Sequence, residues 1–161
     1  MFSLFKKKEA AAAELKAPAS GKVIAMSEVG DEVFSSCMLG KGIAIQPVDG
    51  TVVSPVNGTI SVTMDGSNHA VGIHISDDFD LLIHIGIDTV SLNGEGFTSH
   101  VKTGDTVAVG TPLITFDKDL VVSKGLCPDV ILIVLESSAL PAIEYKTGAD
   151  AVAGETVVAT W

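Results

Sequence analysis

The sequence predicts an all-β fold: an antiparallel β-sandwich or flattened barrel built from duplicated hairpin units, with no long helices. Short runs rich in valine and isoleucine are separated by Gly, Pro, Asn or Asp about every eight to twelve residues, a spacing typical of sandwiches and barrels. No long amphipathic helix is visible, and two pairs of segments echo each other. With 161 residues, 47% of them hydrophobic, the chain is long enough for one well-packed domain.

Residues 1–16 are expected to form a flexible N-terminal segment, and residues 17–161 a single β domain. Phe2, Leu4 and Phe5 precede three lysines and an alanine run, and so short a helix is marginal alone. A frayed tail is one interpretation. The alternative is weak contact of residues 1–8 with an anionic membrane surface. The apolar runs are too short to span a bilayer and no secretory signal is recognisable, so a cytoplasmic protein is expected.

The predicted strands follow one another from Gly21 to the C-terminus. They are the runs GKVIAM (21–26), GIAIQPV (42–48), GTVVSPV (50–56), GTISVTM (58–64), HAVGIHI (69–75), LLIHIGI (81–87), TVAVG (106–110), PLITF (112–116), DVILIVL (129–135) and ETVVATW (155–161). Only residues 118–124 and 137–142 have a composition that permits a brief helix, and Pro141 limits the second.

The two internal echoes suggest duplicated hairpin units. APASGKVI at 17–24 is answered by SPVNGTIS at 54–61, and KTGDTVAVGTPL at 102–113 by KTGADAVAGETV at 146–157. In the first pair, a proline precedes a glycine by three residues, which favours a turn at the same place in both copies. Chance similarity between glycine-punctuated strands is the alternative.

A hairpin is predicted to bring His69 and His84 together. In LLIHIGIDTV, Leu81, Ile83, Ile85 and Ile87 alternate with residues that include His84, Gly86 and Asp88, as in a half-buried strand. His69 lies fifteen residues upstream, across a turn at SDDFD. The two imidazoles would then form one site, with Gly86 leaving open space beside His84.

The other two histidines are expected to lie outside this site. His74 is five residues from His69 and would point to the opposite face of an unbroken strand, and His100 is most simply a surface residue. A lone histidine is more often structural than catalytic, so a structural role for the pair also remains open.

The charge balance excludes a nucleic-acid partner. The chain carries ten lysines, no arginine and a net charge of −10, and from Ala17 onward six lysines face eighteen acids, which gives −12. Such a surface repels nucleic acid and favours basic partners, although solubility alone is a sufficient explanation. Without arginine, imidazoles, backbone N–H groups or a partner's arginine must hold any phosphate. Cys37 and Cys127 fit no metal spacing and are expected to be buried, inert thiols.

Several chemistries are disfavoured by missing motifs. Two histidines can bind zinc, but a protein zinc site normally has three or four ligands, and the sequence has no HExxH, HxH or CxxC. It also lacks the GxSxG of a serine hydrolase and the spacing of a phosphate-binding P-loop. What remains is nucleophilic chemistry at nitrogen: an imidazole that carries a phosphoryl group covalently, with a second imidazole that donates to the phosphoryl oxygens.

The segments GSNHAVGIHI, LLIHIGIDTVSLNGEGF and VKTGDTVAVGTPLITFD closely resemble the glucose-type enzyme IIA of the bacterial phosphoenolpyruvate–sugar phosphotransferase system. The resemblance runs from about Leu15 to the C-terminus and includes APASGKV, GKGIAIQP and SPVNGTI. It departs from the family in residues 129–138, where an asparagine is expected after the strand. It implies a phosphocarrier that needs no cofactor and receives its phosphoryl group from the small protein HPr. The acceptor is a cysteine on the IIB domain of a sugar permease.

The resemblance also implies roles for individual residues. His84 matches the phosphorylated histidine, and His69 the second histidine, which stabilises the phosphoryl group. Ser67 stands where the family often has threonine, positioned to bond His69, and the Gly86 carbonyl would hold Nδ1–H of His84. The family's rim acids and its apolar collar, which binds partners, match Asp31, Asp88, Phe34, Ile43 and Ile45.

Two other functions stay open at this point. The same collar could serve a regulatory module that docks on transporters or metabolic enzymes. A zinc peptidase on a related all-β scaffold is the third class, and His69 and His84 could bind zinc incidentally or together with a partner's carboxylate. The sugar, and whether the chain acts alone or as part of a longer permease, are not predicted.

Overall fold

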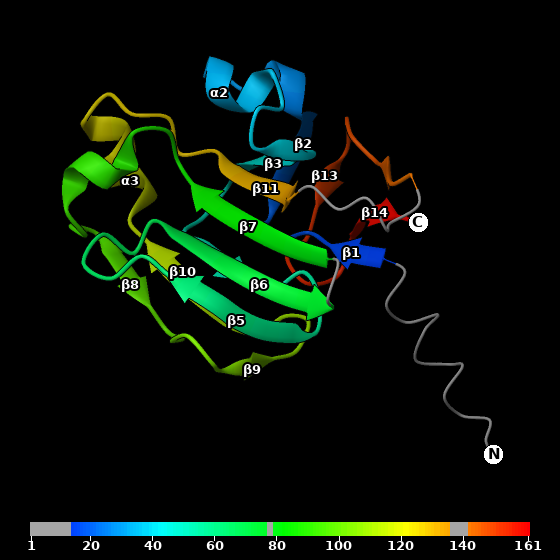
Figure 1. Cartoon of the computed structure of the whole chain (residues 1–161). Helices are drawn as coiled ribbons and strands as arrows, with labels where there is room; N and C mark the ends of the chain where they lie inside the picture. Colours follow the sequence, from blue (N-terminus) through cyan, green and yellow to red (C-terminus); the bar gives the residue numbers. More distant parts are fainter. Residues whose placement is uncertain (1–13, 77–78, 136–141) are drawn as a thin grey trace.

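The computed structural model describes residues 14–76, 79–135 and 142–161, and it confirms the antiparallel all-β prediction (Figure 1). An eight-stranded sheet runs β13-β2-β3-β11-β7-β6-β5-β9, and two three-stranded sheets run β4-β10-β8 and β1-β14-β12. The strands are β1 (Glu14–Lys16), β2 (Gly21–Ala25), β3 (Gly40–Pro47), β4 (Thr51–Val53), β5 (Gly58–Thr63), β6 (Ala70–Ser76), β7 (Phe79–Ile85), β8 (Phe97–Ser99), β9 (Thr106–Val107), β10 (Pro112–Phe116), β11 (Val130–Leu135), β12 (Glu144–Tyr145), β13 (Asp150–Ala151) and β14 (Val157–Thr160).

The helices are short, as predicted. They are α2 (Glu32–Ser35), α3 (Lys118–Ser123) and the 3₁₀ turns η1 (Met26–Glu28) and η2 (Thr89–Leu92). No longer helix occurs in the described residues, and none there is long and apolar enough to cross a membrane. The prediction at 118–124 is confirmed by α3, whereas the one at 137–142 lies outside the described residues except for Ala142. The single turn of α2 was missed because four residues carry no helical periodicity.

The N-terminal boundary differs from the predicted one. β1 pairs with β14 in antiparallel register, and its Leu15 side chain is fully buried in the main core. The domain therefore includes residues 14–16, because a fully buried leucine and a strand ladder tie this stretch to the C-terminal strand. Residues 1–13, and with them the predicted membrane contact of residues 1–8, lie outside the described part of the chain.

The internal echoes correspond to matching pieces of structure. The two segments of the first echo contain β2 and β5, and the two segments of the second contain β9 and β13. Each segment of the second echo supplies an edge strand beside one of the first, so that β5 pairs with β9 and β2 with β13. Even the turn contacts repeat: Gly104 N–H donates to the Ile60 carbonyl at 2.9 Å, and Gly148 N–H to the Val23 carbonyl at 2.8 Å. The two copies therefore form the two opposite edges of the large sheet.

Two apolar clusters lie on opposite faces of the central strands. The main core collects the odd-numbered residues of β7 and β3, including Leu81, Ile83 and Ile85. The second cluster lies below η1 and α2 and contains Ile24, Met26, Val29, Phe34, Ala44, Ile131 and Ile133. Because Ile131 stands opposite His84 in the β11–β7 ladder, His84 belongs to the face of this second cluster.

Alternation along β7 ends at Gly86, so one detail of the strand prediction was wrong. Gly86 has a φ of +79°, a region that a non-glycine residue rarely adopts. The chain turns there, and Ile87 packs against the second cluster instead of joining Leu81, Ile83 and Ile85 in the main core. The turn also starts the loop that carries Asp88.

The expectation for the cysteines is also corrected. Cys37 follows α2 at a positive φ of 61° and is exposed, because the chain reverses there at the surface. Cys127 is partly exposed beside Asp129, and burial raises the pKa of its thiol. A raised pKa favours the protonated thiol, which is the less reactive form.

Candidate active site

The hairpin of β6 and β7 brings His69 and His84 together, as predicted. Ala70 stands opposite His84 in the ladder, and Ile85 N–H donates to the His69 carbonyl at 2.7 Å. The two imidazole rings lie with their centroids 4.9 Å apart, at an angle of 80°. The two rings are therefore close enough to belong to one site.

His84 is held by its own loop. Its Nδ1 lies 2.8 Å from the Gly86 carbonyl oxygen. A carbonyl only accepts hydrogen bonds, so Nδ1 carries the proton and the neutral ring keeps its lone pair on Nε2. The Phe34 ring lies 5.0 Å from the imidazole centroid at 53° and covers one side of it. The ring is thus fixed with a nucleophilic nitrogen available.

Gly86 has no open space beside it, contrary to the sequence-based expectation. A Cβ placed on Gly86 would lie 2.3 Å from Cγ2 of Thr89 and 2.9 Å from the Cys127 carbonyl oxygen. Both contacts belong to the chain itself, so the position is filled rather than left for a partner. Glycine is required here by the positive φ and by this close packing.

His69 is held by Ser67. The serine Oγ lies 2.8 Å from Nδ1 of His69. His69 is largely buried, with an exposed fraction of 9%. The other oxygen near the hydroxyl, the Met64 carbonyl, is 3.5 Å away and makes at most a weak bond. A hydroxyl that donates to Nδ1 leaves the proton of the neutral imidazole on Nε2.

Burial keeps both imidazoles neutral. The pKa of His84 lies below its usual value, first because burial disfavours the charged form and then because His69 is close. The Gly86 carbonyl, Asp31 and Asp88 oppose this shift without reversing it. Burial also lowers the pKa of His69. A neutral His84 at pH 7 is the form that can act as a nucleophile.

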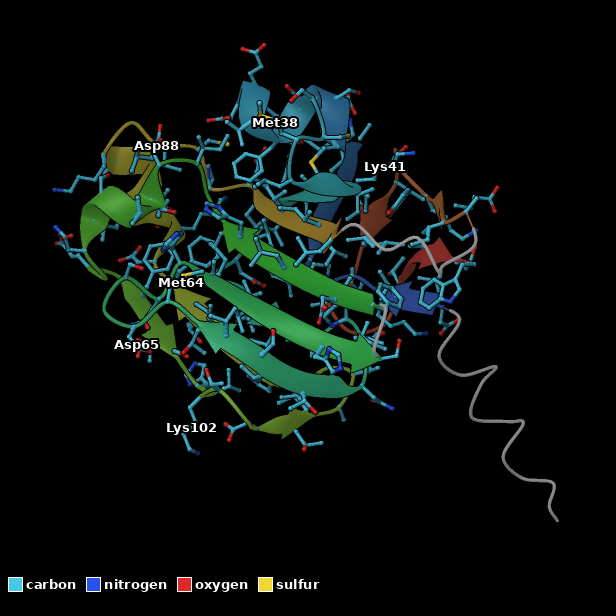
Figure 2. All side chains as sticks on the ribbon, viewed as in Figure 1. Met38, Lys41, Met64, Asp65, Asp88 and Lys102 are labelled. Carbon is cyan, nitrogen blue, oxygen red and sulfur yellow. The ribbon has the colours of Figure 1, made fainter. Side chains whose placement is uncertain are left out.

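Two acidic side chains, Asp31 and Asp88, lie near His84, and exposed apolar side chains lie close to these acids in the sequence. Asp31 caps α2 by accepting from Val33 N–H at 2.8 Å, and Asp88 is exposed at a positive φ of 62°. Figure 2 shows Asp88 and the 75% exposed Met38 at the same upper edge of the view. Val33 and Val90 are also exposed beside the two acids in sequence. We call Asp31, Val33, Met38, Asp88 and Val90 the rim.

Two residues of the predicted collar are not at the surface. Ile43 and Ile45 have exposed fractions of 0% and lie in the main core. Alternation along β3 turns Ala44 instead toward the face of His84. Phe34, in contrast, lies against His84 as expected.

Sequence reasoning missed Thr89, Cys127 and Asp129. Thr89 is fully buried and its hydroxyl donates to the Ile85 carbonyl. The carbonyls of Cys127 and Asp129 accept from Ile87 N–H at 3.0 Å and Gly86 N–H at 2.7 Å. Thr89 lies within LLIHIGIDTVSLNGEGF, one of the segments that carry the family resemblance, and this signal could have identified it. The backbone contacts of Cys127 and Asp129 come from some forty positions later in the chain and leave no local signal in the sequence. In the described residues, no three histidine, cysteine or acidic side chains are grouped as a metal site.

Comparison with known proteins identifies the family of this chain. The family model for the phosphoenolpyruvate-dependent sugar phosphotransferase system, EIIA 1, matches residues 13–140. A glucose-specific EIIA component of Halalkalibacterium halodurans is 41% identical over 165 residues, which cover 99% of this chain and 95% of that protein. A solved structure, the glucose permease IIA of Mycoplasma capricolum, aligns with a TM-score of 0.79 and 34% identity, covering 91% of this chain and 93% of that one.

Other relatives are much longer. A mannose-specific EIIBCA component of Corynebacterium glutamicum is 42% identical over 126 residues, which are 78% of this chain but 18% of that protein. The chain therefore spans about a fifth of such multidomain relatives and nearly the full length of the separate EIIA components. Family model, relatives and solved structure agree over most of the chain: it belongs to the EIIA 1 family of the phosphoenolpyruvate-dependent sugar phosphotransferase system.

Proposed function

We propose that His84 accepts a phosphoryl group from phospho-HPr and passes it to the cysteine of a IIB domain. In the first step the donor's N–P bond breaks and a bond forms from Nε2 of His84 to phosphorus. In the second, the IIB thiolate attacks and Nε2 leaves. The observation that carries the proposal is the 2.8 Å contact of Nδ1 with the Gly86 carbonyl, which leaves Nε2 free in a buried, neutral ring.

His69 is proposed to stabilise the phosphoryl group. With the Ser67 hydroxyl donating to Nδ1, Nε2–H of His69 can donate to a phosphoryl oxygen on His84, whose ring centroid lies 4.9 Å away. Phosphoryl transfer depends mainly on positioning and on donors aimed at the oxygens, so an oriented donor acts most strongly in the transition state. Asp88 is then a rim acid and not a reacting group.

The direct test is incubation with enzyme I, HPr and phosphoenolpyruvate, followed by mass spectrometry. One phosphoryl group is expected on His84, labile in acid and stable in base as a phosphoramidate is. Label on a serine, or none with a competent donor, would refute the proposal. Transfer to a purified IIB domain then separates a phosphocarrier from a module that only docks on transporters or enzymes through the same rim.

The transfer itself needs no cofactor in this family. Zinc is proposed only as an incidental or partner-dependent ligand of His69 and His84. Two imidazoles fall short of the usual three or four ligands, and the described residues offer no third ligand in a group with them. A carboxylate from a docked partner would complete such a site. We further propose a cytoplasmic location and a weak contact of residues 1–8 with the membrane surface.

The rim suits a basic partner. Asp31 and Asp88 stand close enough to His84 to oppose the lowering of its pKa by burial, and Val33, Met38 and Val90 add exposed apolar surface. The chain has no arginine, so a donor that brings its own arginine would supply the phosphate clamp. Nucleic acid is not proposed as a partner because the net charge is −10.

Phosphorylation by phospho-HPr is expected to slow by about tenfold as salt rises from low to several hundred millimolar, because steering by opposite charges is screened. The measurement is the second-order rate at several salt concentrations. Asp31→Asn together with Asp88→Asn should flatten this dependence, and asparagine preserves the α2 cap. Asp150→Asn, on the edge strand β13, is the matched control and should keep the full dependence. Equal slopes in all three proteins would contradict steering by the rim.

The rate of acceptance by His84 is expected to fall on acidification with a midpoint lower than that of a free histidine. Burial lowers the pKa of His84, so protonation removes the nucleophile at a lower pH than in a histidine peptide. The lowered pKa also makes stability depend on pH. At acidic pH the unfolded chain binds more protons at this histidine than the folded chain does, so the free energy of unfolding falls as pH drops below 6.5. NMR titration of His84 in the unphosphorylated protein checks this, with a histidine peptide as reference. A midpoint above that of the peptide would contradict the buried-ring argument.

A further inference from the structure

The direction of the Gly86 carbonyl decides which nitrogen of His84 can react. This carbonyl belongs to the peptide plane between Gly86 and Ile87. In a trans peptide the N–H and C=O point in opposite directions within one plane. The Ile87 N–H donates to the Cys127 carbonyl at 3.0 Å, so the Gly86 carbonyl is aimed the other way, at Nδ1 of His84.

The preceding peptide plane is held at both ends. Gly86 N–H donates to the Asp129 carbonyl at 2.7 Å. On the other side of the same plane, the Ile85 carbonyl accepts from the Thr89 hydroxyl. The positive φ of Gly86 therefore lies between two planes, each bonded to a different part of the fold.

Thr89 is the side chain that closes this arrangement. It is fully buried, and its Cγ2 would lie 2.3 Å from a Cβ on Gly86, so the methyl packs over the glycine. Asp88, at a positive φ of 62°, turns the chain back so that Thr89 begins η2 directly beneath the loop. One side chain thus bonds the plane before Gly86 and packs on Gly86 itself.

We propose that Thr89 is a positioning residue for phosphoryl transfer: together with the Cys127 and Asp129 carbonyls it holds the Gly86 peptide so that His84 keeps its proton on Nδ1. The proposal deepens the proposed function and rests on it. Without this hold, the Gly86 carbonyl can rotate away and Nδ1 loses its acceptor. The neutral ring then also adopts the form with the proton on Nε2, which blocks the nucleophilic lone pair.

Three variants of the full chain test the role of the hydroxyl. Thr89→Val keeps the branched shape and the methyl over Gly86 but removes the donor. Thr89→Ser keeps the donor and removes the methyl. Ser91→Ala is the matched control, because it removes a similar hydroxyl-to-carbonyl bond, 2.8 Å to Asp88, from the same turn without touching the Gly86 peptide. Circular dichroism and thermal unfolding establish that each variant folds.

The main readout is a long-range ¹H–¹⁵N NMR spectrum of His84 in the unphosphorylated protein. Wild type, Thr89→Ser and Ser91→Ala should show only the Nδ1–H form, and Thr89→Val a mixture of both forms. Phosphorylation by phospho-HPr should slow by about tenfold in Thr89→Val, the lower end of what orienting partners contribute at other sites. A single Nδ1–H form with wild-type rate in Thr89→Val would overturn the proposal, as would a mixture in Thr89→Ser.

The proton position needs no donor protein, so it separates this inference from the proposed function. If wild type shows Nδ1–H but is never phosphorylated, the phosphocarrier role fails while the positioning of His84 stands. If Thr89→Val does not fold, hydrogen exchange in the wild-type protein tests whether the Gly86 peptide is held in place. The Gly86 and Ile87 amides should exchange slowly because both are bonded across the loop. Exchange as fast as in an exposed loop would overturn the proposal.

Discussion

His84→Gln is expected to reduce phosphoryl acceptance to background. The glutamine amide nitrogen has its lone pair delocalised into the carbonyl, so no side-chain nitrogen at this position can attack phosphorus. Its NH₂ group can still donate toward the Gly86 carbonyl, and the β6–β7 ladder does not depend on the side chain, so folding should persist. Loss of label therefore reports the chemistry. The measurement is phosphoprotein formation with enzyme I, HPr and phosphoenolpyruvate.

His74→Gln provides the matched control. His74 lies on the same hairpin, with Nδ1 2.8 Å from an Asp80 carboxylate oxygen, and it is proposed to have no role in transfer. This variant removes one imidazole from the same two strands and should accept phosphate normally. Acceptance by His84→Gln, or its loss in His74→Gln, would show that the nucleophile has been assigned to the wrong histidine.

His69→Gln is expected to accept phosphate on His84 but to pass it to a IIB domain about 10²–10³-fold more slowly, the usual effect of losing one oriented donor. A glutamine keeps an N–H donor in the neighbourhood. It loses the orientation that the imidazole gains from Ser67, whose Oγ lies 2.8 Å from Nδ1. The donor matters most when charge moves between the phosphoryl group and its carriers, so the effect should fall on the transition state.

Single-turnover transfer from purified phosphoprotein to IIB measures this second effect. Ser67→Ala should slow transfer by less, because the ring remains and only its orientation is lost. Transfer at the wild-type rate in His69→Gln would reduce His69 to a structural histidine. A variant that accepts no phosphate at all would instead place His69 in the first step.

Much of the framework could be predicted because its signals are local. Alternation along β7 identified Leu81, Ile83 and Ile85 as core, and the fifteen-residue separation of His69 and His84 predicted that a hairpin joins them. The repeated turn sequences predicted duplicated units, which appear as the pairs β2–β13 and β5–β9. Side-chain periodicity and turn composition depend on neighbouring residues, so a single sequence contains them.

The surroundings of His84 were decided by tertiary structure. The turn at Gly86 is filled by Thr89 and the Cys127 carbonyl, α2 carries Phe34 onto the imidazole, and Ile43 and Ile45 face the main core. These facts depend on which strand lies beside which and on which face a short helix covers. Such packing joins residues tens of positions apart through backbone groups that are chemically the same in every residue, and composition and periodicity therefore cannot predict it.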